Sequence, residues 1–152
     1  MHKAFPTSHQ LAAGSLYAQI YAQIKGKGSR VFCAPYDVRL FEDSSKAIVQ
    51  PDVLLVLDKS KLEADHLNGT PDMVAEVITR ESHRRDRIQQ RDIYCHAGVK
   101  EFWIIDPEIK YVEVFLYDHG VYRLCGAYEP GDNAKLTVVA DCSIDIGELF
   151  PD

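Results

Sequence analysis

Two short apolar stretches that each contain one acid, QPDVLLV (residues 50–56) and MVAEVI (residues 73–78), decide the fold of this chain. The run from residue 53 to 57 is continuously apolar, as in a strand covered on both faces. Asp52 opens the first stretch, and Glu76 interrupts the second. An ionised carboxylate is costly to bury unless a charge or a metal compensates it. The two stretches therefore predict a buried sheet that carries a polar site.

Two such carboxylates would repel each other if they met, and a divalent cation relieves both the repulsion and the loss of solvation. If the two strands are neighbours, Asp52 and Glu76 both reach one Mg²⁺ or Mn²⁺ ion. The alternative is that Glu76 pairs with an arginine. Asp72 also follows a proline, but four residues of strand place its Cα ~13 Å from that of Glu76. Asp52 is therefore the better partner for Glu76.

The chain before this centre predicts a helix and a strand. Thr7 and Gln10 fit a capping box, with Thr7 as N-cap, and apolar residues then recur at helical spacing over residues 16–24. Residues 31–40 have the pattern of a strand. Residues 58–70 are polar and are expected to form an irregular loop or a short helix.

The chain after Glu76 predicts a second helix and further strands. Ser82 is expected to cap a helix that runs to about Ala97 and stops at Gly98. The expected strands lie at residues 102–105, 112–116, 121–125 and 136–139, the middle two as a hairpin, followed by an apolar cap at Ile146, Leu149 and Phe150. This order predicts an α/β fold in which helices flank a central mixed sheet. The 152 residues are the size of one domain, so we expect a single domain over residues 1–152.

The composition is that of an ordinary globular protein, with 46% hydrophobic and 26% charged residues. No apolar run approaches the ~20 residues that span a bilayer, and residues 1–6 lack the apolar centre of a signal peptide. We therefore expect a cytoplasmic protein without membrane contact. The four cysteines are far apart and are expected to be small buried hydrophobes rather than disulfide or zinc ligands: Cys33, Cys95, Cys125 and Cys142.

The net charge of −6 argues against a general polyanion binder, but one basic cluster stands out. It surrounds His83 and consists of five arginines: Arg80, Arg84, Arg85, Arg87 and Arg91. One interpretation is a solvated helix face, and the other is a surface that contacts the phosphates of a nucleic acid.

The residues that carry this chemistry resemble a known family. QPDVLLV followed by AEVI (residues 75–78) resembles the PD-(D/E)XK nuclease pattern. The segment RRDRIQQRDIYCHAGVKEFWIIDPE (residues 84–108) is similar to the Uma family of putative restriction endonucleases, with Asp86 and Tyr94 at motif positions of that family. DVRL at residues 37–40 matches another family block.

The resemblance implies a restriction-endonuclease-like core that hydrolyses DNA phosphodiester bonds with a divalent metal, Mg²⁺ or Mn²⁺. It makes Asp52 and Glu76 the metal ligands, and the metal would polarise the phosphate and lower the pKa of an attacking water. It also implies DNA as the partner, with Arg80, Arg84, Arg85 and Arg91 as nucleic-acid contacts. No organic cofactor is expected.

The chain departs from the family pattern at the catalytic lysine. The position two residues after the second acid holds Ile78, and the family's alternative lysine position, on the following helix, holds Gln90. A neutral glutamine only hydrogen-bonds, whereas a lysine neutralises developing charge. Arg87, three residues before Gln90, is a candidate source of the missing charge, although an arginine makes a poor base.

Two further residues and the length of the chain bear on the site. His9 matches a family position near the site, and a capping or structural role is the alternative. Asp37 is either a further acid near the metal or a partner of an arginine. Relatives carry a short segment with a hairpin ahead of the first helix, whereas this chain begins almost at that helix. Any site acid from that segment is therefore expected to be missing.

Three functions follow from these observations. The first is a metal-dependent DNA endonuclease. The second is a catalytically degenerate nuclease-like domain that binds nucleic acid or a protein partner without cleavage, which Ile78 and Gln90 favour. The third is a small-molecule or zinc-binding domain. Nucleases of this kind often form homodimers, and the apolar residues 144–150 are either a dimer surface or part of the core.

Overall fold

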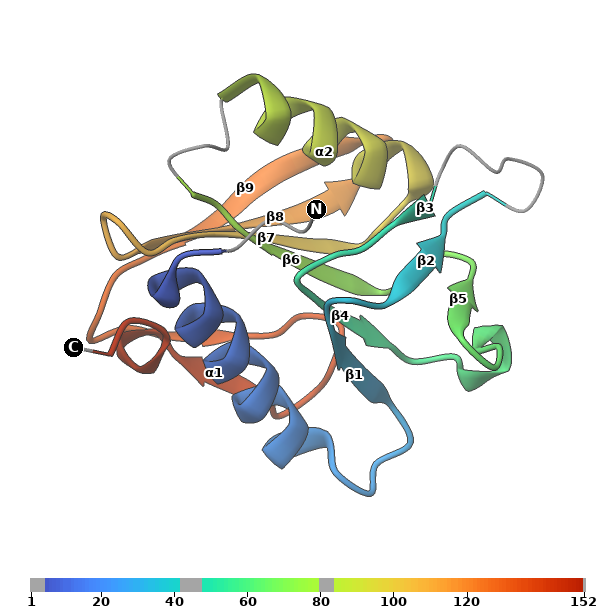
Figure 1. The fold of residues 1–152 in the computed structure, drawn as a ribbon, viewed down its shortest axis with the longest axis horizontal. Coiled ribbons are helices and arrows are strands. Elements are labelled where there is room, and N and C mark those ends of the chain that lie inside the picture. Colours follow the sequence, from blue (N-terminus) through green and yellow to red (C-terminus); the bar gives the residue numbers. More distant parts are fainter. Residues whose placement is uncertain (1–4, 42–47, 80–83, 152) are drawn as a thin grey trace.

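A six-stranded mixed sheet forms the centre of the computed structural model, which describes residues 5–41, 48–79 and 84–151, without the side chains of residues 84–86 (Figure 1). In sheet order the strands are β1 (Arg30–Cys33), β4 (Val53–Val56), β6 (Met73–Val77), β7 (Glu101–Asp106), β8 (Tyr111–Asp118) and β9 (Val121–Tyr128). Strands β6 and β7 are parallel, and every other pair in this sheet is antiparallel. The fold is therefore α/β with a mixed sheet, as the sequence predicts.

One helix lies on each face of this sheet, α1 (Thr7–Ile24) on one and α2 (Arg84–Ala97) on the other (Figure 1). Side chains along a strand point alternately to the two faces. In β6, Met73 and Ala75 accordingly join the core beneath α1, and Val74 joins the core beneath α2. Glu76 alternates with Ala75 and therefore lies on the α2 face. A strand buried on both faces explains why the predicted apolar runs are continuous.

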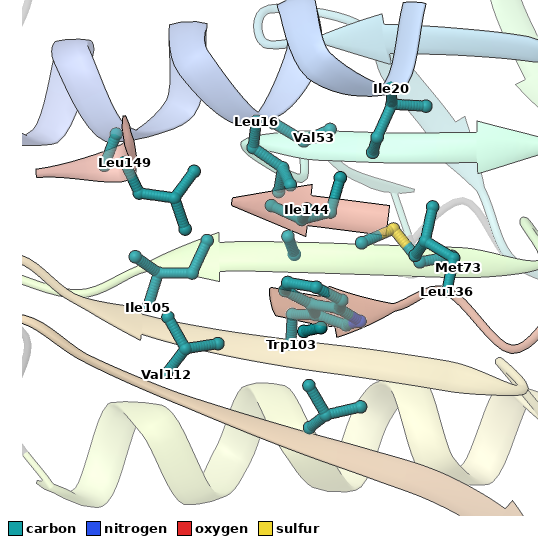
Figure 2. Packing of buried hydrophobic residues seen from close by; sticks show 14 of the residues in the cluster. Leu16, Ile20, Val53, Met73, Trp103, Ile105, Val112, Leu136, Ile144 and Leu149 are labelled. Atoms are coloured by element: carbon teal, nitrogen blue, oxygen red, sulfur yellow. The ribbon is translucent and has the colours of Figure 1, made fainter. Parts of the chain in front are cut away.

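The core beneath α1 also contains the C-terminal segment of the chain. Figure 2 shows Leu16 of α1 with Trp103, Ile144 and Leu149 in this cluster. The segment consists of β10 (Asn133–Lys135), β11 (Ser143–Asp145) and the 3₁₀ helix η2 (Ile146–Leu149). The apolar tail is therefore core rather than a dimer surface.

The prediction of a strand at residues 136–139 is wrong. The ladder instead joins β10 to β11, in antiparallel register. The amide of Leu136 donates to the carbonyl oxygen of Cys142 at 2.9 Å, so the residues between them form a loop. The side chain of Leu136 is buried, so the segment has the apolar pattern of a strand although it pairs with no other strand.

A smaller three-stranded sheet, in the order β3-β2-β5, lies beside the large one (Figure 1). Its strands are β2 (Asp37–Arg39), β3 (Ile48–Val49) and β5 (His66–Asn68), and the 3₁₀ helix η1 (Lys59–Lys61) precedes β5. The single strand expected at residues 31–40 is thus split between two sheets. Pro35 lies at the break and has no amide hydrogen to donate to a ladder. The strand β5, within a segment expected to be a loop or short helix, was missed.

The helix ends partly follow the sequence. Gly98, at φ 81°, ends α2 as predicted, and Ser82 lies outside the described residues. The capping box is wrong. Pro6 is the N-cap of α1, no side chain caps it, and the Pro6 carbonyl oxygen accepts from the amides of both His9 and Gln10.

The cysteines differ from the expectation of burial. Only Cys142 is buried, Cys95 is half-buried, and Cys33 and Cys125 are exposed. All four are free thiols in this structure. Among the described residues, no helix combines the length and the apolarity that crossing a bilayer requires.

Candidate active site

The carboxylates of Asp52 and Glu76 meet because β4 and β6 are neighbours. Val53 pairs with Ala75 in this antiparallel ladder, so Asp52 stands opposite Glu76 at the next position. The amide of Asp52 donates to Glu76 Oε1 at 3.0 Å, and the amide of Val77 donates to Asp52 Oδ2 at 2.7 Å. Each carboxylate is therefore held by the backbone of the opposite strand.

The environment of Glu76 favours its protonated form. The residue is only 8% exposed, and burial together with the charge of Asp52 raises the pKa of Glu76 to about 8. The buried Tyr94 of α2 donates its hydroxyl to Glu76 Oε2 at 2.9 Å. Burial and the neighbouring carboxylate raise the pKa of Tyr94 well above its usual value, so this hydroxyl keeps its proton. The site thus holds one carboxyl that is costly to ionise without a cation.

His9, in the first turn of α1, reaches the carboxylate of Asp52 from the other helix. Its Nε2 lies 3.3 Å from Asp52 Oδ2, and its ring stacks on Phe5 with the centroids 4.3 Å apart. Its Nδ1 is buried and has no hydrogen-bond partner in the described part of the chain. The structure therefore places His9 in contact with Asp52 and not in a cap of the helix.

Arg87 lies on the α2 face of the sheet, in a cavity next to the strand position that pairs with Glu76. Ile104 of β7 pairs in register with Glu76 on one side and with Glu113 of β8 on the other. A cavity of about 230 Å³ lies above this row of paired strand residues. Its lining includes Arg87, Arg91, Ile104 and Glu113. The Nε–H of Arg87 is buried and donates to no partner among the described residues. Strands are ~4.8 Å apart, so this cavity begins about one strand from Glu76.

The remaining predicted site residues occupy different surroundings. Gln90 is exposed on α2. Arg91 lies over the Phe115 ring, 5.8 Å from its centroid. Arg84 and Arg85 begin α2, but their side chains lie outside the described part, as does Arg80 altogether.

Asp37 is exposed on β2, in the smaller sheet, and accepts a hydrogen bond from Gln50 Nε2 at 2.7 Å. Since Gln50 is two residues before Asp52, this bond ties the smaller sheet to the approach of β4. The sequence suggested that Asp37 pairs with an arginine or lies near the paired carboxylates. Neither contact is among the interactions of Asp37 with the described residues. Asp72 accepts from the amide of Leu57 at 2.8 Å, at the other end of β4.

The donor set fits a hard divalent cation. Among the described residues, no group of three or more His, Cys, Asp or Glu side chains is arranged to hold a metal, so the chain would supply two carboxylates. Mg²⁺ is commonly held by one or two carboxylates together with water and substrate phosphates. A cation between Asp52 and Glu76 would also offset the repulsion that raises the pKa of Glu76. The residues that would hold the ion are therefore Asp52 and Glu76.

Two features of the site escaped the sequence interpretation. Tyr94 is part of the apolar stripe of α2, and this pattern predicts an inward side chain but not the carboxylate that its hydroxyl meets. Glu113 alternates with the buried Val112 and Val114 of β8, which places it on the α2 face, but only the packed helix encloses it in a cavity.

Comparisons with known proteins agree with this fold. A crystal structure of a putative nuclease belonging to DUF820 from Anabaena variabilis ATCC 29413 superimposes with a TM-score of 0.73 and 16% sequence identity, covering 99% of this chain and 84% of that one. At this identity the likeness shows the fold. No curated protein matches the chain. Residues 3–147 match the sequence profile of the Uma2 family, described as "Putative restriction endonuclease". Because the match covers nearly the whole chain, the chain belongs to the Uma2 family.

Proposed function

We propose that this chain is a divalent-metal-dependent endonuclease that hydrolyses phosphodiester bonds of DNA, with Asp52 and Glu76 as ligands of Mg²⁺ or Mn²⁺. One observation carries the proposal. Two carboxylates stand opposite each other on neighbouring strands, in a place where burial and mutual repulsion raise the pKa of Glu76 to about 8. A protein core gains nothing from such a pair without a compensating cation. Membership of a family of putative restriction endonucleases supports a nuclease-like function.

The residues around the pair would fix its geometry. When bound, the ion would polarise a phosphate and lower the pKa of an attacking water. The reciprocal backbone hydrogen bonds hold the two carboxylates in register, and Tyr94 holds Glu76 Oε2 from α2. His9 limits the freedom of Asp52 from α1. Side chains fixed from several elements are what a precise catalytic centre requires.

Arg87 would provide the positive charge that the family pattern assigns to a lysine. Its buried Nε, without a partner among the described residues, is available to an anion in the cavity that begins about one strand from Glu76. A guanidinium stays protonated, so Arg87 would stabilise charge on the phosphate oxygens and would not act as a base. The arginines at the start of α2 and Arg91 would contact further phosphates of the DNA. A single centre cuts one strand, so a homodimer belongs to the proposal for double-strand cleavage.

A nuclease-like domain that binds nucleic acid or a protein partner without cleavage is the second candidate. The observation in its favour is that neither position for the family lysine holds a cation. Ile78 is half-buried and apolar, and Gln90 is a neutral, exposed side chain.

Nicking of supercoiled plasmid with Mg²⁺ or Mn²⁺ separates the two candidates. We expect wild type to nick the plasmid, Asp52→Ala to lose at least about a hundredfold in rate, and Gln90→Lys to gain, because a lysine there would neutralise developing charge. Glu129→Ala, which removes an exposed acid in a distant turn, is the matched control and should cut like wild type.

The pattern of results decides between the candidates. Nicking that survives in Asp52→Ala would contradict the proposed centre. A silent wild type with an active Gln90→Lys would identify a nuclease disabled at that one position. Silence in all variants, on both plasmid and single-stranded DNA, would favour the domain that does not cut.

A further inference from the structure

The charges of this chain are divided along the sequence. All 23 acidic residues lie after residue 36, and the segment before it contains four cations, Lys3, Lys25, Lys27 and Arg30. Three of these four fall in the six residues KGKGSR, numbers 25–30, which connect α1 to β1. A chain with a net charge of −6 therefore carries a segment of its sequence that is positive and contains no acid.

The structure places this connection around a cavity of about 500 Å³. The cavity lies where α1 ends and β1 begins, and Lys59 of η1 joins it from another part of the chain. The chemically distinctive lining residues are Tyr21, Lys25, Ser29, Arg30 and Lys59, and no acidic side chain of the described residues lines it. The lining thus combines three cations with one exposed aromatic ring.

These cations are not neutralised within the described part of the chain. None of the ion pairs formed there includes Lys25, Arg30 or Lys59. The Nη1 of Arg30 donates to the carbonyl oxygen of Ser29, at 3.0 Å. Like charges held around one cavity repel each other unless an anion lies between them. The cavity therefore favours an anionic ligand.

The aromatic ring of Tyr21 indicates which class of anionic ligand fits the cavity. Tyr21 is 48% exposed and stacks with Tyr17, with the ring centroids 6.1 Å apart and the planes at 13°. Cationic grooves with exposed aromatic rings bind single-stranded nucleic acid, because the cations follow the phosphates and unpaired bases stack on the rings. A duplex offers no unpaired base to Tyr21.

We propose that this cavity binds a single-stranded segment of nucleic acid, with its phosphates on Lys25, Arg30 and Lys59 and a base on Tyr21. The proposal rests on the proposed function only in that the substrate is a nucleic acid. Arg30 begins β1, and the amide of Ala34, just past its end, donates to the carbonyl oxygen of Asp52 at 3.0 Å. Four residues of strand span ~13 Å, a distance that a few nucleotides of a single strand bridge. One strand would thus reach from this cavity to the paired carboxylates.

Binding of a fluorescent 20-nucleotide single-stranded DNA, measured by anisotropy in EDTA, tests the proposal without cleavage. We expect the double variant Lys25→Glu/Lys59→Glu to bind at least about tenfold more weakly, with the slope of log affinity against log salt reduced by about 1.4, since each lost phosphate contact on a single strand removes about 0.7. Lys100→Glu, a single charge reversal beside a different cavity, is the control and should leave the affinity within about twofold.

The ring is tested separately. Tyr21→Ala should weaken binding of the single strand about tenfold, Tyr21→Phe should bind like wild type, and a duplex of the same sequence should be insensitive to both changes, because stacking needs an unpaired base. Thermal melting establishes that each variant is folded.

Two outcomes would overturn the proposal. One is wild-type affinity in the double variant. The other is equal loss on single strand and duplex with no effect of Tyr21→Ala, which would identify only a general electrostatic surface. Plasmid nicking reports on Asp52 and Glu76 independently, so loss of this proposal with nicking retained, or the reverse, is recognisable.

Discussion

The pKa of the Glu76 side chain differs strongly between the folded and the unfolded chain. Its pKa is about 8 in the folded chain, whereas its usual value is 4.5. Below about pH 4.5 the Glu76 carboxyl is protonated in both the folded and the unfolded state, so its titration does not change the free energy of unfolding. Between these values only the unfolded state releases the proton, so the stability of the metal-free protein falls as pH rises, and the loss is complete above about 8. The acid is thus retained at a cost in stability.

This argument predicts that Glu76→Gln stabilises the metal-free protein. Glutamine is uncharged, and its amide can still accept from Asp52 and contact Tyr94. In EDTA at pH 7 we expect a gain of about 2–3 kcal/mol in the free energy of unfolding, growing from pH 4.5 to 8 and constant above. Urea denaturation across this range measures it. A gain that does not change with pH would show that Glu76 is not the titrating group.

At the scale of elements, two glutamine side chains of α1 make hydrogen bonds with the backbone of β11 in the C-terminal segment. These bonds resemble those that a neighbouring strand would make. Gln23 accepts from the amide of Ser143 and donates to its carbonyl oxygen, both at 2.8 Å. Gln19 makes the same pair of bonds with Asp145, at 2.8 and 3.1 Å. These four bonds occupy the edge of β11, and they hold the helix whose first turn brings His9 to Asp52. The helical spacing of residues 19 and 23 matches the two-residue spacing on one side of the strand.

We expect Gln23→Ala to destabilise the protein by about 1–3 kcal/mol, because it leaves polar groups of Ser143 without their partner in a half-buried place. Gln10→Ala, at an exposed position of the same helix, is the control and should change stability by less than about 0.5 kcal/mol. Thermal and urea unfolding measure both. Equal effects of the two changes would mean that the contact with β11 is not responsible, because alanine has a higher helix propensity than glutamine at both positions.

For the molecule as a whole, the proposed metal centre links metal binding to folding and to protons. The four contacts at the site come from α1, the start of β4, β6 and α2, so an ion held there would bind the folded chain and not the unfolded one. Because the pKa of Glu76 is about 8 without the ion, the carboxyl still carries its proton at pH 7. Binding of a cation to the ionised form would therefore release a proton.

At a Mn²⁺ concentration 100 times the dissociation constant, we expect a stabilisation of about 2.7 kcal/mol. Titration calorimetry at pH 7, in buffers of different ionisation enthalpy, should detect the release of close to one proton per ion. Asp52→Ala and Glu76→Ala should remain folded and lose both effects. Undiminished Mn²⁺ binding in both variants would contradict the proposed ligands.

The sequence by itself determined the class of fold, most of the sheet and the two acids that stand out in it. Buried strands such as β4 and β6 are visible as apolar runs because their pattern depends only on neighbouring residues. The same local reasoning failed at residues 31–40, where one pattern covers strands of two sheets, and at residues 136–139, where apolar burial occurs without strand pairing.

Only the tertiary structure decided what the acids meet. The hydrogen bond from the amide of Asp52 to Glu76 joins residues 24 positions apart, the bond from Tyr94 to Glu76 spans 18 positions, and the bonds of Gln23 to Ser143 span 120. Such contacts depend on which strands become neighbours and on which face a helix packs. Local propensity carries no information about either choice, because both are set by burial over the whole chain.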